Sequence, residues 1–402
     1  MKTTIISVGS ELLNGMMVDT NSVYMAEELN RYGIKINAKI VAGDIIEDIV
    51  KAIEFADKNS DLVIMTGGLG PTIDDLTRDA IAQYLGKKLV LYDEELQKLK
   101  ERFLAYKLEM PEKNIRQVMF PEEAEIIENR KGTAPSFKVG KIAAFPGVPD
   151  ELRDSFPRYC EKIAQEHNLK TTIYIKDILV WGVPESQLEA KIIDIIENEK
   201  EVFVEFLVKD YGIIIRLLVD EGKKSRAEEL KQKIYERVSE NIFGEDSDRI
   251  ESLLVEILAK NRMSFSTAES CTGGLIASKI VGVSGASKVF EKGYITYSNE
   301  SKCELLGVNP ETLKNHGAVS EETVFEMLKG LNSSSAIAIS GIAGPEGGSE
   351  EKPVGTVFAG IKINDIYITE KMFIRGDRNK IRERAAMSAM FMLLTELKKQ
   401  GL

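Results

Sequence analysis

The sequence predicts an α/β protein built from three domains, and three observations lead to this fold class. The chain has 402 residues, which is too long for one ordinary hydrophobic core. Strand and helix patterns alternate in the first and last thirds, and this order predicts mostly parallel sheets with helices on both faces. The middle part follows the order strand, helix, strand, strand, helix, which is typical of a small α+β domain. We expect the domains to span residues 1–168, 169–245 and 246–402.

The composition describes a soluble globular protein, with 43% hydrophobic and 29% charged residues. The net charge of -11 argues against a general nucleic-acid binder or a binder of anionic membranes. No apolar run approaches the roughly 20 residues that a membrane-spanning helix needs. Three scattered cysteines, with no zinc-ligand spacing, favour a reducing cytoplasm over a disulfide framework.

The first domain is predicted from periodicity. Residues 3–8 form a strand pattern, residues 34–40 alternate between apolar and polar side chains, and residues 62–65 are a short apolar run. Helical spacing fills the intervals at 23–29 and 46–53. The expected result is a three-layer, mostly parallel sheet, in which ligands bind beyond the carboxyl ends of the strands.

Two stretches fall at these strand ends. The first comprises residues 9–11 and 19–21, and it places Glu11 and Asn21 there. The second stretch, TGGLGPT at 66–72, supplies Gly67, Gly68 and Gly70 as a cradle for a diphosphate. Three aspartates follow at the start of the next helix and are candidate oxygen ligands of a divalent metal: Asp74, Asp75 and Asp79. The alternative is that Asp74 and Asp75 only complement the helix dipole.

The motifs of the first domain resemble a known fold family. TGGLGPT at 66–72 with DDLT at 74–77 is similar to the signature of molybdopterin-binding domains. Four further motifs narrow the resemblance to the N-terminal domain of the CinA family of competence/damage-inducible proteins. They are GSELL at 9–13, DTN at 19–21, GTAP at 132–135 and FPGVP at 145–149. The resemblance implies metal-assisted hydrolysis of ADP-ribose. A pterin-binding or adenylyl-transfer role, as in molybdenum-cofactor relatives, is the alternative.

The middle domain resembles the KH-like region of the same family. It lacks the Gly-x-x-Gly segment with which KH domains clamp nucleotides, so RNA binding does not follow. We expect a spacer or a dimer contact. Residues 241–249 have the composition of a linker.

The last domain is organised around AESCTGG at 268–274. A strand pattern at 263–267 precedes this stretch and a helical pattern follows it. Small polar residues and glycines between a strand and a helix place free amides near a ligand. Ser270 is therefore a candidate nucleophile, with an oxyanion site formed by the following amides. The alternative is an ordinary helix cap with glycines for close packing.

Further motifs extend over the whole last third. These motifs stand in the order found in the CinA C-terminal domain. They are GYITYSNESK at 293–302, HGAVSEET at 316–323, SGIAGPEGGSEEKPVGTV at 340–357 and GDRNKIRERA at 376–385. We therefore identify the chain as a member of the CinA family over its full length. This domain resembles the nicotinamide-nucleotide amidase, which converts nicotinamide mononucleotide to nicotinate mononucleotide and ammonia.

The resemblance also implies roles for individual residues. Tyr297 and Lys302 would form the base system for Ser270, and the amidase would need no cofactor. Cys271 is a rival nucleophile, although a buried small side chain is the preferred interpretation. Arg375 and Arg378 are candidates for binding the ligand phosphate, against surface ion pairing. The remaining predicted contacts to the substrate come from the loop residues: Cys271, Thr272, Gly273, Gly274, Asn299, Ser340, Gly341, Ala343 and Gly344.

The sequence thus predicts a cytoplasmic, bifunctional hydrolase of pyridine-nucleotide salvage. Its expected partners are small nucleotides, namely nicotinamide mononucleotide and ADP-ribose, and we expect a homodimer without membrane or nucleic-acid contacts. The expected cofactor is a divalent metal ion, such as Mg²⁺, for the N-terminal domain. A competence or recombination adaptor without catalysis is the alternative from another functional class.

Overall fold

The computed structural model describes residues 1–169 and 173–402. The chain divides into two compact units, of which the first comprises Met1–Tyr174 with Asp220–Gly222 and the second Ile175–Val219 with Lys223–Leu402. Residues 170–172, at the start of the predicted middle domain, lie outside the described residues. The expected mixed α/β fold is confirmed in both units. No described helix has the length and apolar character needed to cross a bilayer.

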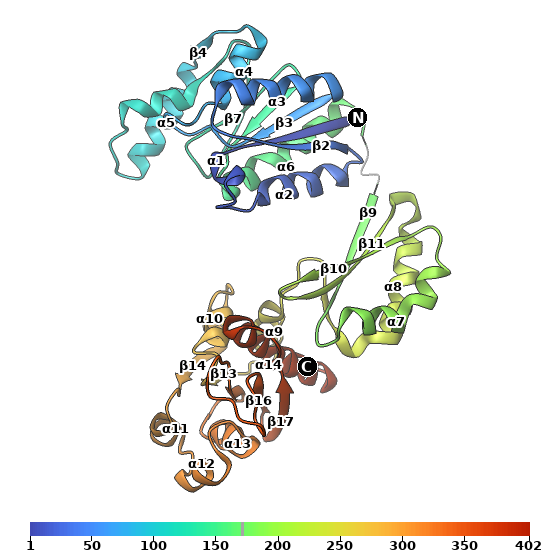
Figure 1. Cartoon of the computed structure of the whole chain (residues 1–402), viewed down its shortest axis with the longest axis vertical. Helices are drawn as coiled ribbons and strands as arrows, with labels where there is room; N and C mark the ends of the chain where they lie inside the picture. Colours follow the sequence, from blue (N-terminus) through green and yellow to red (C-terminus); the bar gives the residue numbers. More distant parts are fainter. Residues whose placement is uncertain (170–172) are drawn as a thin grey trace. The chain divides into compact units, whose positions relative to one another are not determined.

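The first unit is a sheet with helices on both faces (Figure 1). Its strand order is β2-β1-β3-β8-β7-β6, and the four strands from β2 to β8 are parallel. The elements are β1 (Lys2–Val8), α1 (Ser10–Leu13), α2 (Thr20–Arg31), β2 (Lys35–Ala42), α3 (Ile46–Asn59), β3 (Leu62–Thr66), α4 (Thr77–Leu85), β4 (Leu89–Leu91), α5 (Asp93–Ala105), β5 (Met119–Pro121), β6 (Glu125–Ile127), β7 (Ser136–Val139), β8 (Ile142–Phe145) and α6 (Pro149–Glu166).

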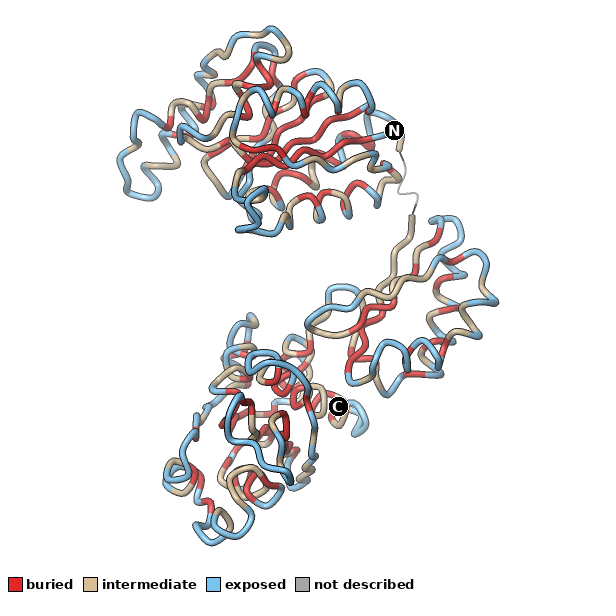
Figure 2. Tube along the Cα trace, viewed as in Figure 1, coloured by how far each residue is buried: buried red, intermediate tan, exposed pale blue. Residues whose placement is uncertain are grey.

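Alternation along the strands explains the two layers of core in this unit. Ile6 and Met65 face α3 and α4, whereas Ile5 and Ile64 face α2 and α6. Every residue of β3 is buried, as expected for a central parallel strand, and Figure 2 shows this buried centre. The carboxyl ends of β1, β3 and β8 therefore share one edge, where the glycine loop begins.

The middle domain is a four-stranded sheet with two helices. Its order is β10-β11-β9-β12, with β9 (Ile173–Val180), α7 (Glu185–Glu197), β10 (Phe203–Lys209), β11 (Gly212–Asp220), α8 (Lys224–Val238) and β12 (Ile242–Glu245). The prediction of a linker at 241–249 is wrong, because β12 pairs with β9. Ile242 and Phe243 bury their side chains in the core, and the Asp248 carboxylate accepts a hydrogen bond from the Glu245 amide at 2.8 Å.

The C-terminal domain has a five-stranded sheet of order β14-β13-β15-β16-β17, in which the first three strands are parallel and the last two antiparallel. The elements are α9 (Ile250–Lys260), β13 (Phe265–Glu269), α10 (Leu275–Val281), β14 (Phe290–Ile295), α11 (Asn299–Leu306), α12 (Pro310–His316), α13 (Glu321–Lys329), β15 (Ser335–Gly341), β16 (Thr356–Ile363), β17 (Ile366–Phe373) and α14 (Arg378–Lys399). Helices α9, α10 and α14 supply the core on one face, and α11 and α13 supply it on the other.

The middle and C-terminal domains share one hydrophobic core cluster. Trp181 and Phe243 of the middle domain pack in the same cluster as Leu394 of α14. The indole N–H of Trp181 donates to the Ser388 hydroxyl at 3.2 Å, and the Lys398 ammonium donates to the Phe243 carbonyl at 2.8 Å. These contacts explain why both domains belong to one compact unit.

Candidate active site

The C-terminal site begins with a serine and a lysine brought together from separate elements. Ser270 follows β13, and Lys302 lies on α11. The Lys302 Nζ is 3.2 Å from the Ser270 Oγ. Both side chains are buried, at 8% and 1% exposure. The two residues that the sequence predicts as nucleophile and base thus lie within hydrogen-bond reach of each other.

Backbone carbonyls hold the lysine in place. Its Nζ donates to the Thr296 carbonyl at 2.8 Å and lies 3.4 to 3.5 Å from the carbonyls of Tyr297 and Ser298. Burial lowers the pKa of Lys302 from its ordinary value of 10.5, because the charged form loses water. Lys302 is therefore not an exposed lysine at a helix start. A lysine with a lowered pKa can be neutral and accept a proton from a hydroxyl.

Cys271 has the opposite character. Its side chain belongs to the hydrophobic core, and a Cβ at Gly341 would lie 3.2 Å from its Sγ. Burial raises the pKa of the thiol to about 12. A thiol with this pKa remains protonated near neutral pH and is a poor nucleophile. The environment supports the interpretation of Cys271 as a packed small side chain.

The amides at the start of α10 are occupied by a residue that the sequence analysis missed. Glu269 is fully buried, and its carboxylate accepts hydrogen bonds from the amides of Gly274, Ile276 and Ala277 at 2.9 to 3.1 Å. The expectation that this helix end attracts a ligand anion is therefore wrong, because an internal carboxylate already satisfies it.

Donors for the predicted oxyanion site would then come from earlier in the loop. The Ser270 amide donates to the Ile339 carbonyl at 3.0 Å, and the Gly273 amide donates to the Ser270 carbonyl at 3.2 Å. Among residues 270–274, the amides of Cys271 and Thr272 are left without an acceptor on any other described residue. Both follow the candidate nucleophile directly, as an oxyanion site requires.

The second glycine loop lies beside the first because β13 and β15 are neighbours in the sheet. Ser340 and Gly341 end β15, and the Ser340 hydroxyl donates to the Ala318 carbonyl at 2.7 Å. Ala343 and Gly344, which follow in the same loop, are also buried. These residues are placed next to the Ser270 loop, as the shared strand ends predict.

Arg378 connects this second loop with the Tyr297 segment. Its guanidinium donates to the Gly344 carbonyl at 2.7 Å and to the Tyr297 hydroxyl at 3.1 Å. The Tyr297 side chain is 64% exposed, so it is not a core residue. Its carbonyl faces Lys302, whereas its hydroxyl is bonded to Arg378. Asn299 is exposed at the first turn of α11.

The two arginines predicted to bind phosphate lie in different surroundings. Arg375 lines a cavity of about 850 Å³ between β17, α14 and Trp181 of the middle domain. Arg378 lies at the rim of the two loops described above. Of these two arginines, Arg378 is therefore the one that the described hydrogen bonds join to the segment carrying Lys302.

The N-terminal loop lies where three strand ends meet. The Asn21 side-chain amide donates to the Thr66 hydroxyl at 3.2 Å and to the Gly147 carbonyl at 2.8 Å. Gly67 has φ of 98°, and any side chain there would collide with the Val8 carbonyl. The close approach of these strands requires glycine at this position. Gly68, Gly70 and Asn21 thus share one edge of the sheet.

The three predicted metal ligands are not equivalent. Asp75 accepts hydrogen bonds at 2.6 to 2.7 Å from the Gly70 amide and from the amide and hydroxyl of Thr72. Asp79 pairs with Arg116 at 2.7 Å. Asp74 is exposed. Across residues 1–169 and 173–402, no three or more His, Cys, Asp or Glu side chains are arranged to hold a metal ion. A metal ion at this loop would therefore have Asp74 as its protein ligand and would take its other oxygens from outside the protein, as Mg²⁺ often does.

A buried arginine also donates hydrogen bonds to two carbonyls of this loop. Arg78 on α4 donates to the carbonyls of Leu69 and Gly70, both at 2.7 Å. Burial lowers its pKa to about 10. Arg116 adds a bond to the Thr72 carbonyl at 3.2 Å. Two cationic groups therefore stand at the loop that is predicted to bind a diphosphate.

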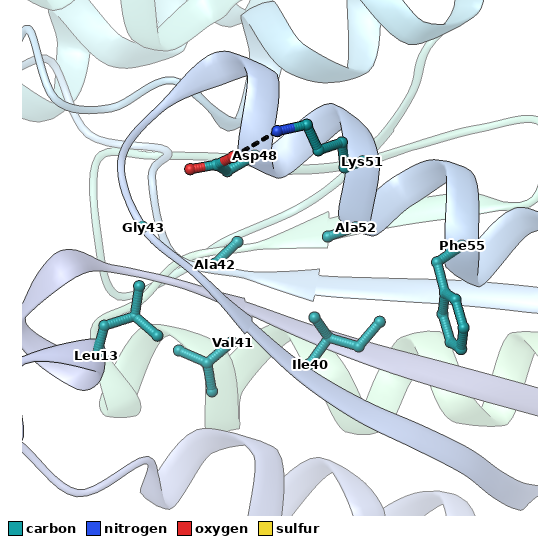
Figure 3. A pocket seen from close by; sticks show the side chains of 9 residues that line it. All are labelled: Leu13, Ile40, Val41, Ala42, Gly43, Asp48, Lys51, Ala52 and Phe55. Carbon is teal, nitrogen blue, oxygen red and sulfur yellow. Dashed lines mark hydrogen bonds and ion pairs between the residues drawn. The ribbon is translucent and has the colours of Figure 1, made fainter.

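A separate hollow of about 480 Å³ lies along β2 and α3, and Figure 3 shows its lining. Phe55, Ile40 and Leu13 form its apolar part, and the Lys51–Asp48 pair closes one side at 3.0 Å. Glu11 lies outside this lining. Its carboxylate folds back over Gly9, since a Cβ there would lie 2.5 Å from it.

The charged residues that fix the loops were not predicted from the sequence. Glu269 could have been noticed, because a charged residue closes an otherwise buried strand. Arg78 gave no such signal, and neither did Arg382, whose guanidinium donates to the Cys271 and Thr272 carbonyls, since charged residues on predicted helices usually face water. Their positions depend on how the helices pack, which local periodicity does not reveal.

Comparison with known proteins gives matches along the whole chain. A probable molybdopterin binding domain matches residues 4–165, the damage-inducible protein CinA KH domain matches 176–244, and the CinA C-terminal domain matches 247–397. The chain thus combines a molybdopterin-binding-like domain, a KH-like domain and a CinA C-terminal domain.

Two relatives of this chain are named CinA-like proteins. A CinA-like protein of Fusobacterium nucleatum is 48% identical over 403 residues and covers 100% of both chains. A CinA-like protein of Kosmotoga olearia is 42% identical and covers 97% of both. The crystal structure of the competence/damage inducible protein CihA from Agrobacterium tumefaciens is 39% identical, with a TM-score of 0.36, and covers 37% of this chain and 95% of that chain. The chain belongs to the CinA family.

Proposed function

We propose that the C-terminal domain hydrolyses the carboxamide of nicotinamide mononucleotide, giving nicotinate mononucleotide and ammonia. The observation that carries this proposal is the distance of 3.2 Å between the buried Lys302 Nζ and the Ser270 Oγ. Burial lowers the pKa of Lys302, which makes the neutral amine accessible. An amide is a poor electrophile, so it needs both an activated nucleophile and an oxyanion site.

The reaction proceeds through an acyl-enzyme. Neutral Lys302 takes the hydroxyl proton while the Ser270 Oγ attacks the carboxamide carbon. The amides of Cys271 and Thr272 stabilise the oxyanion of the tetrahedral intermediate. Protonated Lys302 then delivers the proton to the leaving nitrogen, ammonia departs, and an ester to Ser270 remains. Lys302 activates water in the same way, and hydrolysis of the ester restores Ser270 and releases the carboxylate.

The other predicted residues bind and position the substrate. Arg378, held by the Gly344 carbonyl, is the favoured partner of the ligand phosphate. Tyr297 is bonded to this arginine through its hydroxyl, so it orients the phosphate site in addition to its predicted catalytic role. Arg375, in the cavity beside Trp181, is the less favoured phosphate ligand.

For the N-terminal domain we propose hydrolysis of ADP-ribose at the 66–72 loop. The diphosphate would lie against the Gly68 amide, near the cationic Arg116, because the Gly67 and Gly70 amides already donate to the Phe145 carbonyl and to Asp75. A divalent ion, when bound with Asp74, would neutralise charge on the phosphates. Asp75 would serve the loop geometry, because its carboxylate is occupied by Gly70 and Thr72.

Two assays test these activities separately. Purified full-length protein is given nicotinamide mononucleotide, and ammonia is measured with and without a metal chelator. The proposal expects the same rate in both samples. A second assay measures AMP and ribose 5-phosphate from ADP-ribose, which should appear only with a divalent ion. Absence of both products would favour the non-catalytic adaptor.

A further inference from the structure

Arg382 on α14 braces the loop that carries the candidate nucleophile. Its Nε donates to the Cys271 carbonyl at 3.1 Å, and its Nη2 donates to the Thr272 carbonyl at 2.8 Å. One rigid guanidinium thus holds two successive carbonyls. Arg382 is 111 residues from Cys271 along the chain, so this contact depends on the packing of α14.

Holding the carbonyls also orients the amides. In a trans peptide the C=O and the following N–H lie in one plane and point in opposite directions. The Cys271 carbonyl shares its plane with the Thr272 amide, and the Thr272 carbonyl shares its plane with the Gly273 amide. Arg382 therefore turns both N–H groups to the side of the loop away from its guanidinium.

The loop needs such a brace because its own sequence does not fix it. Gly273 and Gly274 have φ of 62° and 92°, values that glycine adopts without side-chain support. A Cβ at Gly273 would lie 3.5 Å from the Arg382 Nη2, so the guanidinium packs directly against the loop. The Ser270 amide fixes one end of the loop on Ile339, and Glu269 fixes the start of α10.

We propose that Arg382 is a positioning residue that aims the Thr272 amide, and with it the oxyanion site, at the atom attacked by Ser270. Charge-assisted hydrogen bonds to the carbonyls also polarise the two peptide groups and strengthen their N–H donors. Arg382 acts through the backbone and does not touch the substrate. This inference rests on the proposed amidase and adds the group that assembles its oxyanion site.

The test compares Arg382→Ala with wild type in the full-length chain. If Arg382 positions the oxyanion donors, kcat for ammonia release should fall about a hundredfold, as loss of an oxyanion donor does. The KM for nicotinamide mononucleotide should stay nearly unchanged. Added guanidinium salt should restore part of kcat in this variant and should not accelerate the wild type. Unchanged kcat, or a higher KM at the wild-type kcat, would overturn the proposal.

A matched control lies two residues further along the helix. Arg384→Ala removes the guanidinium that lies 5.6 Å from the Trp181 ring, and it should leave kcat unchanged. If Arg382→Ala does not fold, Arg382→Lys is measured instead. A single ammonium can hold one carbonyl well but not both, so kcat should still fall and KM should stay nearly constant. A wild-type kcat in Arg382→Lys would contradict the proposal.

A second readout separates this proposal from the identity of the substrate. A fluorophosphonate probe labels an activated serine, and its labelling rate depends on the same oxyanion donors. Slower labelling of Ser270 in Arg382→Ala would support the brace even if nicotinamide mononucleotide were not hydrolysed. Equal labelling rates in Arg382→Ala and wild type would refute it. A wild type that is not labelled would contradict the nucleophile and the brace together.

Discussion

The 66–72 loop of the first unit and the 270–274 loop of the second are built alike. Each follows a buried parallel strand, contains glycines with positive φ, and has two successive carbonyls held by one arginine. In each, a carboxylate accepts hydrogen bonds from backbone amides. Asp75 serves the first loop and Glu269 serves the second.

The two loops differ in which amides remain free. Asp75 lies beyond its loop and bonds to the amides of Gly70 and Thr72 within it, while Pro71 has no N–H. Glu269 lies before its loop and bonds only to amides from Gly274 onward, which spares Cys271 and Thr272. The second loop also receives the buried Lys302 from α11. The first loop thus has its Gly70 and Thr72 amides occupied by its own carboxylate, whereas the second keeps the two amides that follow Ser270 and has a lysine beside them.

The largest expected effect comes from removing the nucleophile of the second loop. Ser270→Ala should lower kcat/KM for ammonia release by about a thousandfold or more, as losses of catalytic serines do. Hydrolysis of ADP-ribose at the first loop should not change. Cys271→Ala and His316→Ala are the controls and should be mild. If Cys271→Ala lost ammonia release while Ser270→Ala kept a near-normal rate, Cys271 and not Ser270 would be the nucleophile.

Removing the base should have the next largest effect. Lys302→Ala should lower kcat by about a hundredfold to ten-thousandfold, the range for general acid–base catalysis. Lys302→Arg should be similarly slow, because a guanidinium stays protonated. Thermal unfolding of each variant checks that the fold is kept. Near-normal activity in Lys302→Arg would exclude proton transfer through this position.

The pH dependence tests the same group without a mutation. Because burial lowers the pKa of Lys302, the neutral amine forms at a lower pH than for an exposed lysine. The kcat/KM for ammonia release should therefore rise with pH through this pKa and level off below the ordinary value of 10.5. A rate that is constant from acidic to alkaline pH would contradict a lysine base.

In the first loop, Asp74 and Asp75 should act by different routes. Asp74→Ala should reduce hydrolysis of ADP-ribose by weakening the response to divalent ions, with unfolding unaffected. Asp75→Ala removes the acceptor of the Gly70 and Thr72 amides, so it should also destabilise the first unit, by about 1 kcal/mol, because water can bond to the exposed Thr72 amide instead. Ammonia release should survive in both variants. If the hydrolysis rate of Asp74→Ala depended on the divalent-ion concentration in the same way as that of wild type, Asp74 would not be a metal ligand.

The smallest effect on chemistry is expected from cutting the chain near Asp248. The fragment from Asp248 keeps Ser270, Lys302 and Arg382 and should keep amidase activity. It loses the packing of Trp181 and Phe243 against the C-terminal core, so its melting temperature should fall. A soluble but inactive fragment would show that the second loop depends on the middle domain.

Sequence patterns predicted the strands and the glycine loops because both depend on local order. Alternation at 34–40 and the apolar run at 62–65 correspond to β2 and β3. Residues 241–249 misled the prediction, because Gly244 and the surrounding charges hide a short strand whose apolar residues are only Ile242 and Phe243. A strand of four residues is too short for its periodicity to be read.

The candidate site was predicted from motifs and resemblance, and its internal contacts were not. Ser270 and Lys302 were named from the sequence, but their distance follows from β13 and β14 being neighbours. Glu269 accepts hydrogen bonds from the α10 amides, and Arg382 donates to the loop carbonyls. Both contacts depend on side-chain direction and on helix packing. Neither can be deduced from spacing along the chain.

The most direct measurement of the central claim is a double-mutant cycle of Ser270→Ala and Lys302→Ala, followed by ammonia release from nicotinamide mononucleotide. If the two side chains act as one catalytic unit, the double variant should be no slower than the slower single variant, as in other enzymes with coupled catalytic groups. Losses of kcat that multiply in the double variant would show that Ser270 and Lys302 act independently, and the account of the site would be wrong.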